Sequence, residues 1–252
     1  MPSSMVWIVG NGALLIVAYL LGSFPTGYLF GKWLKGIDIR TQGSGSTGAT
    51  NVLRTLGKGP GITVLLVDVL KGAAAIALIR FIYDSIASPS AFWSTSFGWV
   101  ASWLGAAPAN SAEWFPWVVV LGGLAAVVGH SKSIWLGFSG GKSVAVGLGI
   151  LLALNWQVGL MTFGVFGLVL ALFRIVSLSS ICGAIAVPML MFGLKLPLAY
   201  ILLGLVGGLY VVLRHRSNIQ RMFRGTEPRL GQKVVLGADA ISEQSAIESS
   251  GQ

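Results

Sequence analysis

The sequence predicts an all-α, polytopic integral membrane protein with about seven transmembrane helices, its N-terminus outside the cell and its C-terminus in the cytoplasm. The first observation is the composition: 54% of the 252 residues are hydrophobic and only 10% are charged, whereas roughly a quarter are charged in soluble domains. The second is a series of long apolar runs broken by short polar ones. The third is that Lys and Arg gather in alternate breaks, as they do in cytoplasmic loops. An ordinary soluble domain is excluded.

The predicted spans are apolar runs, most of them near the roughly 20 residues that cross a bilayer. They cover residues 5–30, 61–83, 114–129, 144–154, 157–173, 178–193 and 196–213. The first charge is Lys32, so the first run lacks the basic start of a signal peptide and is expected to be a retained helix. We expect one transmembrane domain over 1–237 and a disordered cytoplasmic tail over 238–252, where residues are small and polar.

The basic residues test this arrangement. With the N-terminus outside, the cytoplasmic segments contain every Lys and Arg except Lys71 and Arg80 in the second span and Lys195 in an outer loop. The outer loop over 84–113 has no Lys or Arg. The formal net charge of +9 points to anionic lipid or an anionic substrate, and a chain this apolar is not expected to bind nucleic acid.

Two polar loops on the predicted cytoplasmic side carry the clearest chemical signal. GSGSTGATN over 43–51 and GFSGGKS over 137–143 combine glycine, hydroxyls and a cation. Glycine lets backbone N–H groups turn toward a phosphate, and hydroxyls and cations add donors and charge. The second string lacks the spacing and the preceding strand of a nucleotide-binding P-loop, so a phosphate site without nucleotide is favoured. Most other glycines, including Gly204, Gly207 and Gly208, are expected to permit close helix packing.

Both histidines follow apolar spans. His215 and Asn218 are three residues apart on one helical face, near Arg214 and Arg221, and we interpret this pair as functional. For His130 a structural cap and a functional role stay equally open.

Asp68 and Lys71, three apart within the second span, predict an intramembrane ion pair that supports the site. The single cysteine, Cys182, excludes an intramolecular disulfide and is interpreted as a packing thiol. No metal-ligand spacing and no GxSxG elbow is present, so no metal and no cofactor are expected.

Six strings occur in order from about residue 20 to 231: LLGSFPTGYLFG, GSGSTGATNVLRTLG, DVLKG, GHSKSIWLGFSGGKSVA, VSLSSI and RHRSNIQRMFRGTEPRLG. Together they resemble the bacterial membrane glycerol-3-phosphate acyltransferases that use acyl phosphate, a family with seven membrane helices. The resemblance implies that the hydroxyl of sn-glycerol 3-phosphate attacks the acyl carbon of acyl phosphate. Lysophosphatidic acid and inorganic phosphate are the products, in the first acylation step of phospholipid synthesis.

The resemblance also implies the site. Its substrate-binding residues would be Ser44, Asn51, Arg54, Gly140, Gly141, Lys142 and Ser180, with Asn51 shaping the loop, and its catalytic pair would be His215 and Asn218. Glu227 is expected to be structural. Ser46 replaces an amide of the family pattern, Lys132 and Ser133 replace Phe-Pro, Ser139 replaces a Lys, and Ser143 replaces a Gly.

The expected partners are acyl phosphate, glycerol 3-phosphate and the bilayer of the cell membrane, with the active site facing the cytoplasm. The oligomeric state is left open, a monomer included. A transporter or carrier of a phosphate-bearing anion is the alternative, although no internal repeat of the kind that transporters use is visible. A scaffold protein would leave the glycine, hydroxyl and histidine clusters unexplained. Either His215 or the leaving phosphate could accept the hydroxyl proton.

Overall fold

The computed structural model describes residues 3–87 and 111–232, and every regular element within them is helical. The helices are α1 Ser3–Ser23, α2 Thr26–Lys35, α3 Ala49–Leu56, α4 Lys58–Ala87, α7 Ser111–Ser131, α8 Val144–Leu154, α9 Trp156–Phe173, α10 Val176–Gly193, α11 Leu198–Arg214 and α12 Arg216–Phe223. Two short 3₁₀ turns, η1 Ile39–Thr41 and η2 Ile134–Leu136, lie just before the two polar loops. The all-α prediction is confirmed.

Each predicted span falls on a helix, but the expected number of seven is not established. Among the described residues, 5 helices are long and apolar enough to cross a membrane, or up to 6 if the bent pair α11 and α12 forms one span. The 11 residues of α8 rise by about 16 Å, short of the roughly 30 Å hydrocarbon core. Orientation stays a prediction. The tail over 238–252 and most of the outer loop lie outside the described residues.

The first predicted span, 5–30, corresponds to one candidate span over Trp7–Lys35, but the helix is interrupted within it. α1 ends at Ser23 and α2 begins at Thr26, with Pro25 between them. Proline has no N–H to donate and its ring clashes with the preceding helical turn, so a helix breaks there. α2 then ends at Lys35 and is capped by Gly36, whose φ of 66° suits glycine and whose N–H donates to the carbonyl of Lys32.

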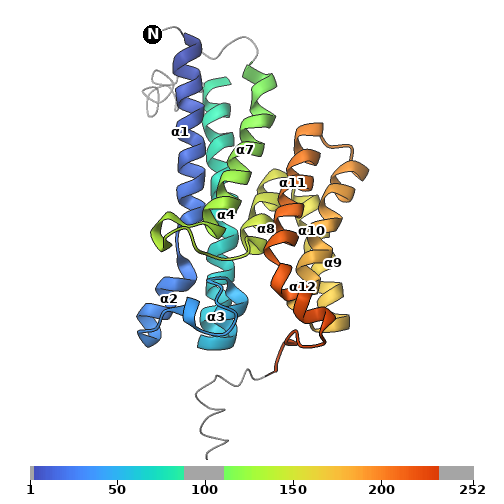
Figure 1. The fold of residues 1–252 in the computed structure, drawn as a ribbon. Helices are drawn as coiled ribbons and strands as arrows, with labels where there is room; N and C mark the ends of the chain where they lie inside the picture. Colours follow the sequence, from blue (N-terminus) through green and yellow to red (C-terminus); the bar gives the residue numbers. More distant parts are fainter. Residues whose placement is uncertain (1–2, 88–110, 233–252) are drawn as a thin grey trace, which may run out of the picture.

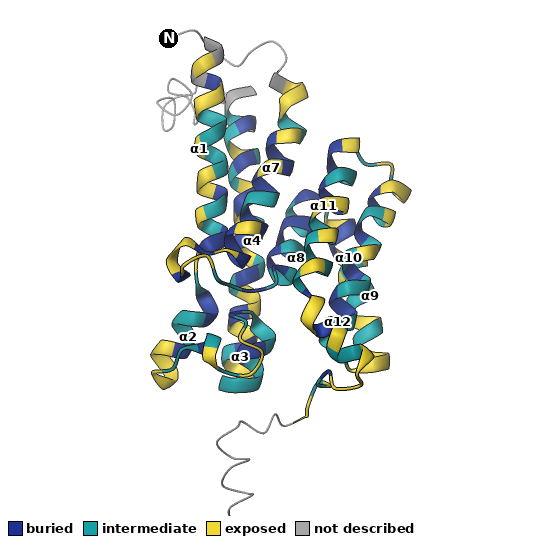
Figure 2. Ribbon diagram, in the orientation of Figure 1, coloured by how far each residue is buried: buried dark blue, intermediate teal, exposed yellow. Residues whose placement is uncertain are grey.

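Two groups of helices make up the fold (Figure 1). α1, α4 and α7 pack together, and α9, α10 and α11 form the second group, with α8 packed between α4 and α9. Large apolar side chains such as Leu70, Leu172 and Phe192 are exposed on the outer faces of the helices, and Figure 2 shows exposed positions along these faces. In a chain that spans a membrane, such faces meet lipid.

Close packing through glycine is confirmed for many helix contacts. A Cβ on Gly72 of α4 would lie 2.2 Å from the carbonyl oxygen of Val146 of α8, and one on Gly149 would lie 1.9 Å from that of Val69. Gly208 contacts the backbone of α10 in the same way. For Gly207 the expectation is wrong, because nothing lies within 4 Å of its Cβ position.

Arg80, a charge in the second span, has a structural role. Its Nη1 and Nη2 donate to the carbonyl oxygens of Ala153 and Leu154 at 2.8 and 3.0 Å. These are among the last carbonyls of α8, which have no partner within their own helix. Asn155 then begins α9 by accepting a hydrogen bond from the N–H of Val158 at 3.0 Å.

Candidate functional site

The first polar loop is organised by Asn51, which is 1% exposed at the start of α3. Its Nδ2 donates to the carbonyl oxygens of Ile39, Gln42 and Ser46, and its Oδ1 accepts from the N–H of Ser44 at 2.9 Å. One amide thus satisfies four backbone groups of the loop. Because these contacts occupy the amide of Asn51, they favour a role in shaping the loop over direct substrate binding.

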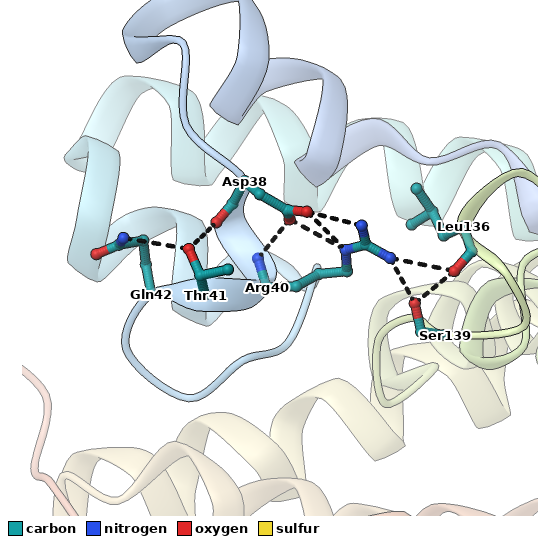
Figure 3. A network of polar contacts seen from close by, with 6 residues as sticks. All are labelled: Asp38, Arg40, Thr41, Gln42, Leu136 and Ser139. Carbon is teal, nitrogen blue, oxygen red and sulfur yellow. Dashed lines mark hydrogen bonds and ion pairs between the residues drawn. The ribbon is translucent and has the colours of Figure 1, made fainter.

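Arg40, in η1 just before the first polar loop, reaches the second polar loop (Figure 3). Asp38 holds the guanidinium through both carboxylate oxygens, at 2.7 to 3.1 Å, while Nη1 donates to the carbonyl of Leu136 and to the Oγ of Ser139 at 3.1 and 2.9 Å. The pairing with Asp38 raises the pKa of Arg40. An arginine that precedes the first loop therefore contacts Ser139, the position where the family pattern has a Lys.

The second polar loop turns tightly against the end of α7. The N–H of Gly141 donates to the carbonyl oxygen of His130 at 3.1 Å. A Cβ on Gly140 would lie 2.2 Å from that same oxygen, and a Cβ on Gly141 would lie 2.0 Å from His130 Nε2. Only glycine fits at either position of this turn, which places Lys142 beside α12.

Ser143 adopts a φ of 62°, a conformation that favours glycine. Its buried hydroxyl donates to the carbonyl oxygen of Val127 at 2.7 Å. This hydrogen bond holds a serine where the family pattern has glycine.

Lys142, Asn218 and Glu227 form the centre of the site. Lys142 Nζ donates to Asn218 Oδ1 at 2.5 Å, and Asn218 Nδ2 donates to Glu227 Oε1 at 2.6 Å. Ser177 of α10 donates to the same oxygen at 2.7 Å, and Arg221 Nε pairs with Glu227 Oε2 at 2.7 Å. Glu227 thus orients α10, α12 and the second loop, in keeping with the structural role expected for it.

The electrostatics of this centre favour an anion. Burial lowers the pKa of Lys142 to about 8, and the cations of Arg221, Arg54 and Arg214 add to that effect against the opposing charge of Glu227. Burial alone would raise the pKa of Glu227, but hydrogen bonds from Asn218, Ser177 and Arg221 outweigh it and lower the pKa. Several cations share one carboxylate, and a bound phosphate would balance their charge.

His215 lies where α11 meets α12 and is 3% exposed. Its Nδ1 is 2.7 Å from the carbonyl oxygen of Val211. Since a carbonyl only accepts, Nδ1 carries a proton, and in the neutral ring Nε2 is left with a lone pair. His215 can therefore accept a hydrogen bond or a proton.

Some of the site residues expected from the sequence lie at the Lys142 centre and others do not. Lys142 and Asn218 are in contact, and Arg54 Nη2 reaches the carbonyl of Pro228 at 3.3 Å, next to Glu227. Ser44 is exposed, with its N–H bound to Asn51.

Ser180 is on α10, and its hydroxyl donates to the carbonyl of Val176 in its own helix at 2.9 Å. Among the described residues, neither Ser44 nor Ser180 hydrogen-bonds to the Lys142 centre.

Sequence reasoning missed two contributors. Ser177 lies three residues before Ser180 in VSLSS, so the two serines share one face of a helix. That spacing could have indicated Ser177 as well as Ser180. Arg40 carried no such signal, because its contact with Ser139 joins segments that are distant in the sequence.

Comparisons with known proteins decide the family. The family model described as Glycerol-3-phosphate acyltransferase matches residues 12–225. This chain belongs to the glycerol-3-phosphate acyltransferase family. A glycerol-3-phosphate acyltransferase of Trichormus variabilis is 59% identical over 96% of this chain and 99% of the relative. Another member, from Acaryochloris marina, is 57% identical over 93% of this chain and 99% of the relative.

Solved structures of the same family are also similar. The crystal structure of PlsY (YgiH), an integral membrane glycerol 3-phosphate acyltransferase, in its glycerol 3-phosphate form matches with a TM-score of 0.71 and 36% identity. The match covers 88% of this chain and 96% of that chain. The lysophosphatidic acid form matches with a TM-score of 0.68.

The family, the acyltransferase activity and the multi-pass membrane character expected from the sequence are confirmed. The acyl donor and the site residues stay predictions.

Proposed function

We propose that this chain transfers an acyl group from acyl phosphate to glycerol 3-phosphate at the cytoplasmic face of the cell membrane. The hydroxyl oxygen of glycerol 3-phosphate forms a bond to the acyl carbon, and the bond between that carbon and the phosphate oxygen breaks. The hydroxyl proton goes to the leaving phosphate, so the products are lysophosphatidic acid and inorganic phosphate. Acyl phosphate already carries a good leaving group, so no covalent enzyme intermediate is required.

The observation that carries this proposal is the Lys142–Asn218–Glu227 centre among Arg54, Arg214 and Arg221. Two substrates that each bear phosphate repel one another, and the cations offset that repulsion. Holding both in contact supplies most of what a reaction with an activated acyl donor needs. The acyltransferase relatives favour this chemistry over the carrier alternative.

The remaining residues have defined parts in the proposal. The lone pair on His215 Nε2 accepts a hydrogen bond from the attacking hydroxyl. Arg54 and Lys142 bind phosphate oxygens, and the backbone of Gly140 and Gly141 lets those oxygens approach closely. The phosphate groups would lie in the cytoplasmic loops and the acyl chain among the lipid-facing helices.

Purified protein assayed for phosphate release from acyl phosphate, with and without glycerol 3-phosphate, tests the proposal. We expect release that depends on glycerol 3-phosphate and matches the lysophosphatidic acid formed, mole for mole. Lys142→Ala serves as the control for contaminating hydrolysis. Glycerol 3-phosphate uptake into vesicles without release of phosphate would support the carrier alternative and overturn the proposal.

A further inference from the structure

A buried chain of polar groups, Asp68, Lys71 and His130, lies behind the second polar loop and has no part in the reaction proposed above. Lys71 Nζ is 2.8 Å from Asp68 Oδ1, 2.9 Å from the carbonyl oxygen of Phe24 and 3.0 Å from His130 Nδ1. The side chain of Thr26 also donates to Asp68, at 3.2 Å. The intramembrane ion pair expected from the sequence is present, and it reaches a histidine.

The contacts of Lys71 determine where the proton of His130 is. An ammonium has three donors and no acceptor, and here it has three partners. Asp68, 1% exposed, requires a paired cation, because an unpaired buried carboxylate is costly. Lys71 is therefore the donor to His130 Nδ1. With Nδ1 as acceptor, the neutral ring of His130 carries its proton on Nε2.

That Nε2–H is directed at the glycine turn. A Cβ on Gly141 would lie 2.0 Å from Nε2 and 2.9 Å from both neighbouring ring carbons, so the ring tip faces Gly141. Nε2 has no hydrogen-bond partner among the described residues.

On the same turn, Arg214 Nη2 donates to the carbonyl of Gly141 at 3.1 Å, and Arg214 Nε is buried without a partner in the part of the chain that the structure describes. Two N–H donors without an acceptor among the described residues, His130 Nε2 and Arg214 Nε, are therefore in the two side chains that contact Gly141.

We propose that His130 is a second ligand-binding histidine, whose Nε2–H donates to a phosphate oxygen at the Gly140–Lys142 turn and whose tautomer is imposed by the Asp68–Lys71 pair. The two histidines of the chain then have opposite tautomers: His130 presents a donor and His215 presents a lone pair. Asp68 and Lys71 are positioning residues that act through His130. The inference rests on the proposed function only in taking the ligand at this turn to be a phosphate.

The tautomers can be measured directly, because a chain with two histidines gives only two sets of ring signals. Protein labelled with ¹⁵N-histidine in detergent, assigned with His215→Gln, is expected to show a bare Nδ1 and a protonated Nε2 for His130, and the reverse for His215. Adding inorganic phosphate is expected to shift the His130 Nε2–H proton to higher frequency in a saturable way. A His130 protonated on Nδ1, or an Nε2–H signal unmoved by saturating phosphate, overturns the proposal.

Variants of Asp68 and Lys71 can show whether the pair positions His130 or only stabilises the fold. The Asp68→Asn/Lys71→Met double variant removes both charges together, which buried pairs often tolerate. It is expected to remain folded, to lose the fixed tautomer and to raise the KM for glycerol 3-phosphate about tenfold with a smaller change in kcat. Leu70→Val, on the exposed face of the same helical turn, is the matched control and should change neither. An active double variant with an unchanged KM and a retained tautomer would overturn the positioning role.

At His130 itself, His130→Gln keeps an N–H near the Nε2 position and His130→Leu does not. We expect His130→Gln to retain a KM within a few-fold of wild type and His130→Leu to raise it about tenfold or more. Equal KM values in the two variants would contradict ligand binding by Nε2–H. If the wild-type protein transfers no acyl group yet phosphate still shifts the His130 signal, the proposed function fails and this inference stands. If the wild type transfers the acyl group but the His130 signal stays unmoved, the proposed function stands and this inference fails.

Discussion

Lys142 Nζ lies 2.5 Å from Asn218 Oδ1, although four helices, α8 to α11, lie between the two residues in the sequence. This contact joins the glycine turn after α7 to α12, which begins directly after His215. It orients a lysine ammonium by an amide that is itself held by Glu227. The cation is thus fixed in place without being neutralised by a carboxylate of its own.

Lys142 is expected to give the reaction an alkaline limb. Its pKa is lowered to about 8, chiefly by burial, so the ammonium is charged below that pH and loses its charge as the pH rises through it. We expect kcat/KM of the wild type to fall above about pH 8. Lys142→Arg keeps its charge throughout and should lack this limb, although its activity is lower because a guanidinium does not replace a compact ammonium. An identical limb in both proteins would contradict the assignment.

Lys142→Ala removes the cation altogether. A hydrogen bond to a charged group contributes about 1.5–3 kcal/mol, so kcat/KM should fall by roughly 10- to 100-fold or more. Steady-state kinetics at pH 7 measure this loss, and Lys195→Ala, at the α10–α11 turn away from the site, is the control. Wild-type kinetics in Lys142→Ala would show that the phosphate does not bind at this loop.

Glu227 is expected to support stability as well as geometry. Replacing it by Ala leaves Asn218, Ser177 and Arg221 without their shared acceptor, and should cost about 2–4 kcal/mol of unfolding free energy. Because its pKa is lowered below the ordinary 4.5, this contribution is complete above pH 4.5 and is lost as the pH falls through the lowered value. Thermal unfolding in detergent at pH 7 and in acid measures both effects. Glu113→Gln, exposed on α7, is the control and should unfold like wild type.

His215→Gln distinguishes a general base from a residue that holds the hydroxyl. A positioned base contributes about 100- to 10,000-fold, whereas a glutamine can still accept a hydrogen bond. We expect His215→Gln to keep turnover within about tenfold of wild type and His215→Ala to lose more, with the leaving phosphate as the proton acceptor. A loss beyond 100-fold in His215→Gln, together with the loss of any fall in rate at acid pH that the wild type shows, would instead identify His215 as the base.

Gly140→Ala should abolish activity for a steric reason. The added Cβ would lie 2.2 Å from the carbonyl oxygen of His130, and a backbone atom at a helix end cannot easily move away. Gly147→Ala, seven residues later with nothing within 4 Å of the new Cβ, is the matched control and should be active. Acyl transfer measured on equal amounts of folded protein compares the two, and an active Gly140→Ala would show that the turn has room for a side chain.

The orientation in the membrane is expected to be N-out and C-in. After Cys182→Ala, a cysteine at exposed Gln232 should resist a membrane-impermeant thiol reagent in intact cells, while one at Ser96 should be labelled. The charge distribution is the physical reason, since Lys and Arg accumulate in cytoplasmic loops. Labelling in the opposite pattern would move the whole site to the other side of the membrane.

The sequence could predict most helices but not the contacts between them. Apolar length and basic loops indicate spans, and the spacing of Asp68 and Lys71 is enough to predict their ion pair. The sequence does not indicate that this pair contacts His130, or that Lys142, Asn218 and Glu227 are in contact. Those contacts depend on how separate helices pack. The break at Pro25 has a clear signal in the proline itself, but the apolar run continues on both sides and favours a single span.

Arg80, which binds the last carbonyls of α8, marks one end of a helix whose length has a consequence for the proposed substrate. Lys142 lies just before α8, and Arg80 lies at its other end. The helix between them spans about 16 Å at 1.5 Å per residue, roughly half of a hydrocarbon core about 30 Å thick. If the phosphate of the substrate is held at Lys142 at the membrane surface, as proposed, a carbon chain that follows α8 would end near the middle of the membrane.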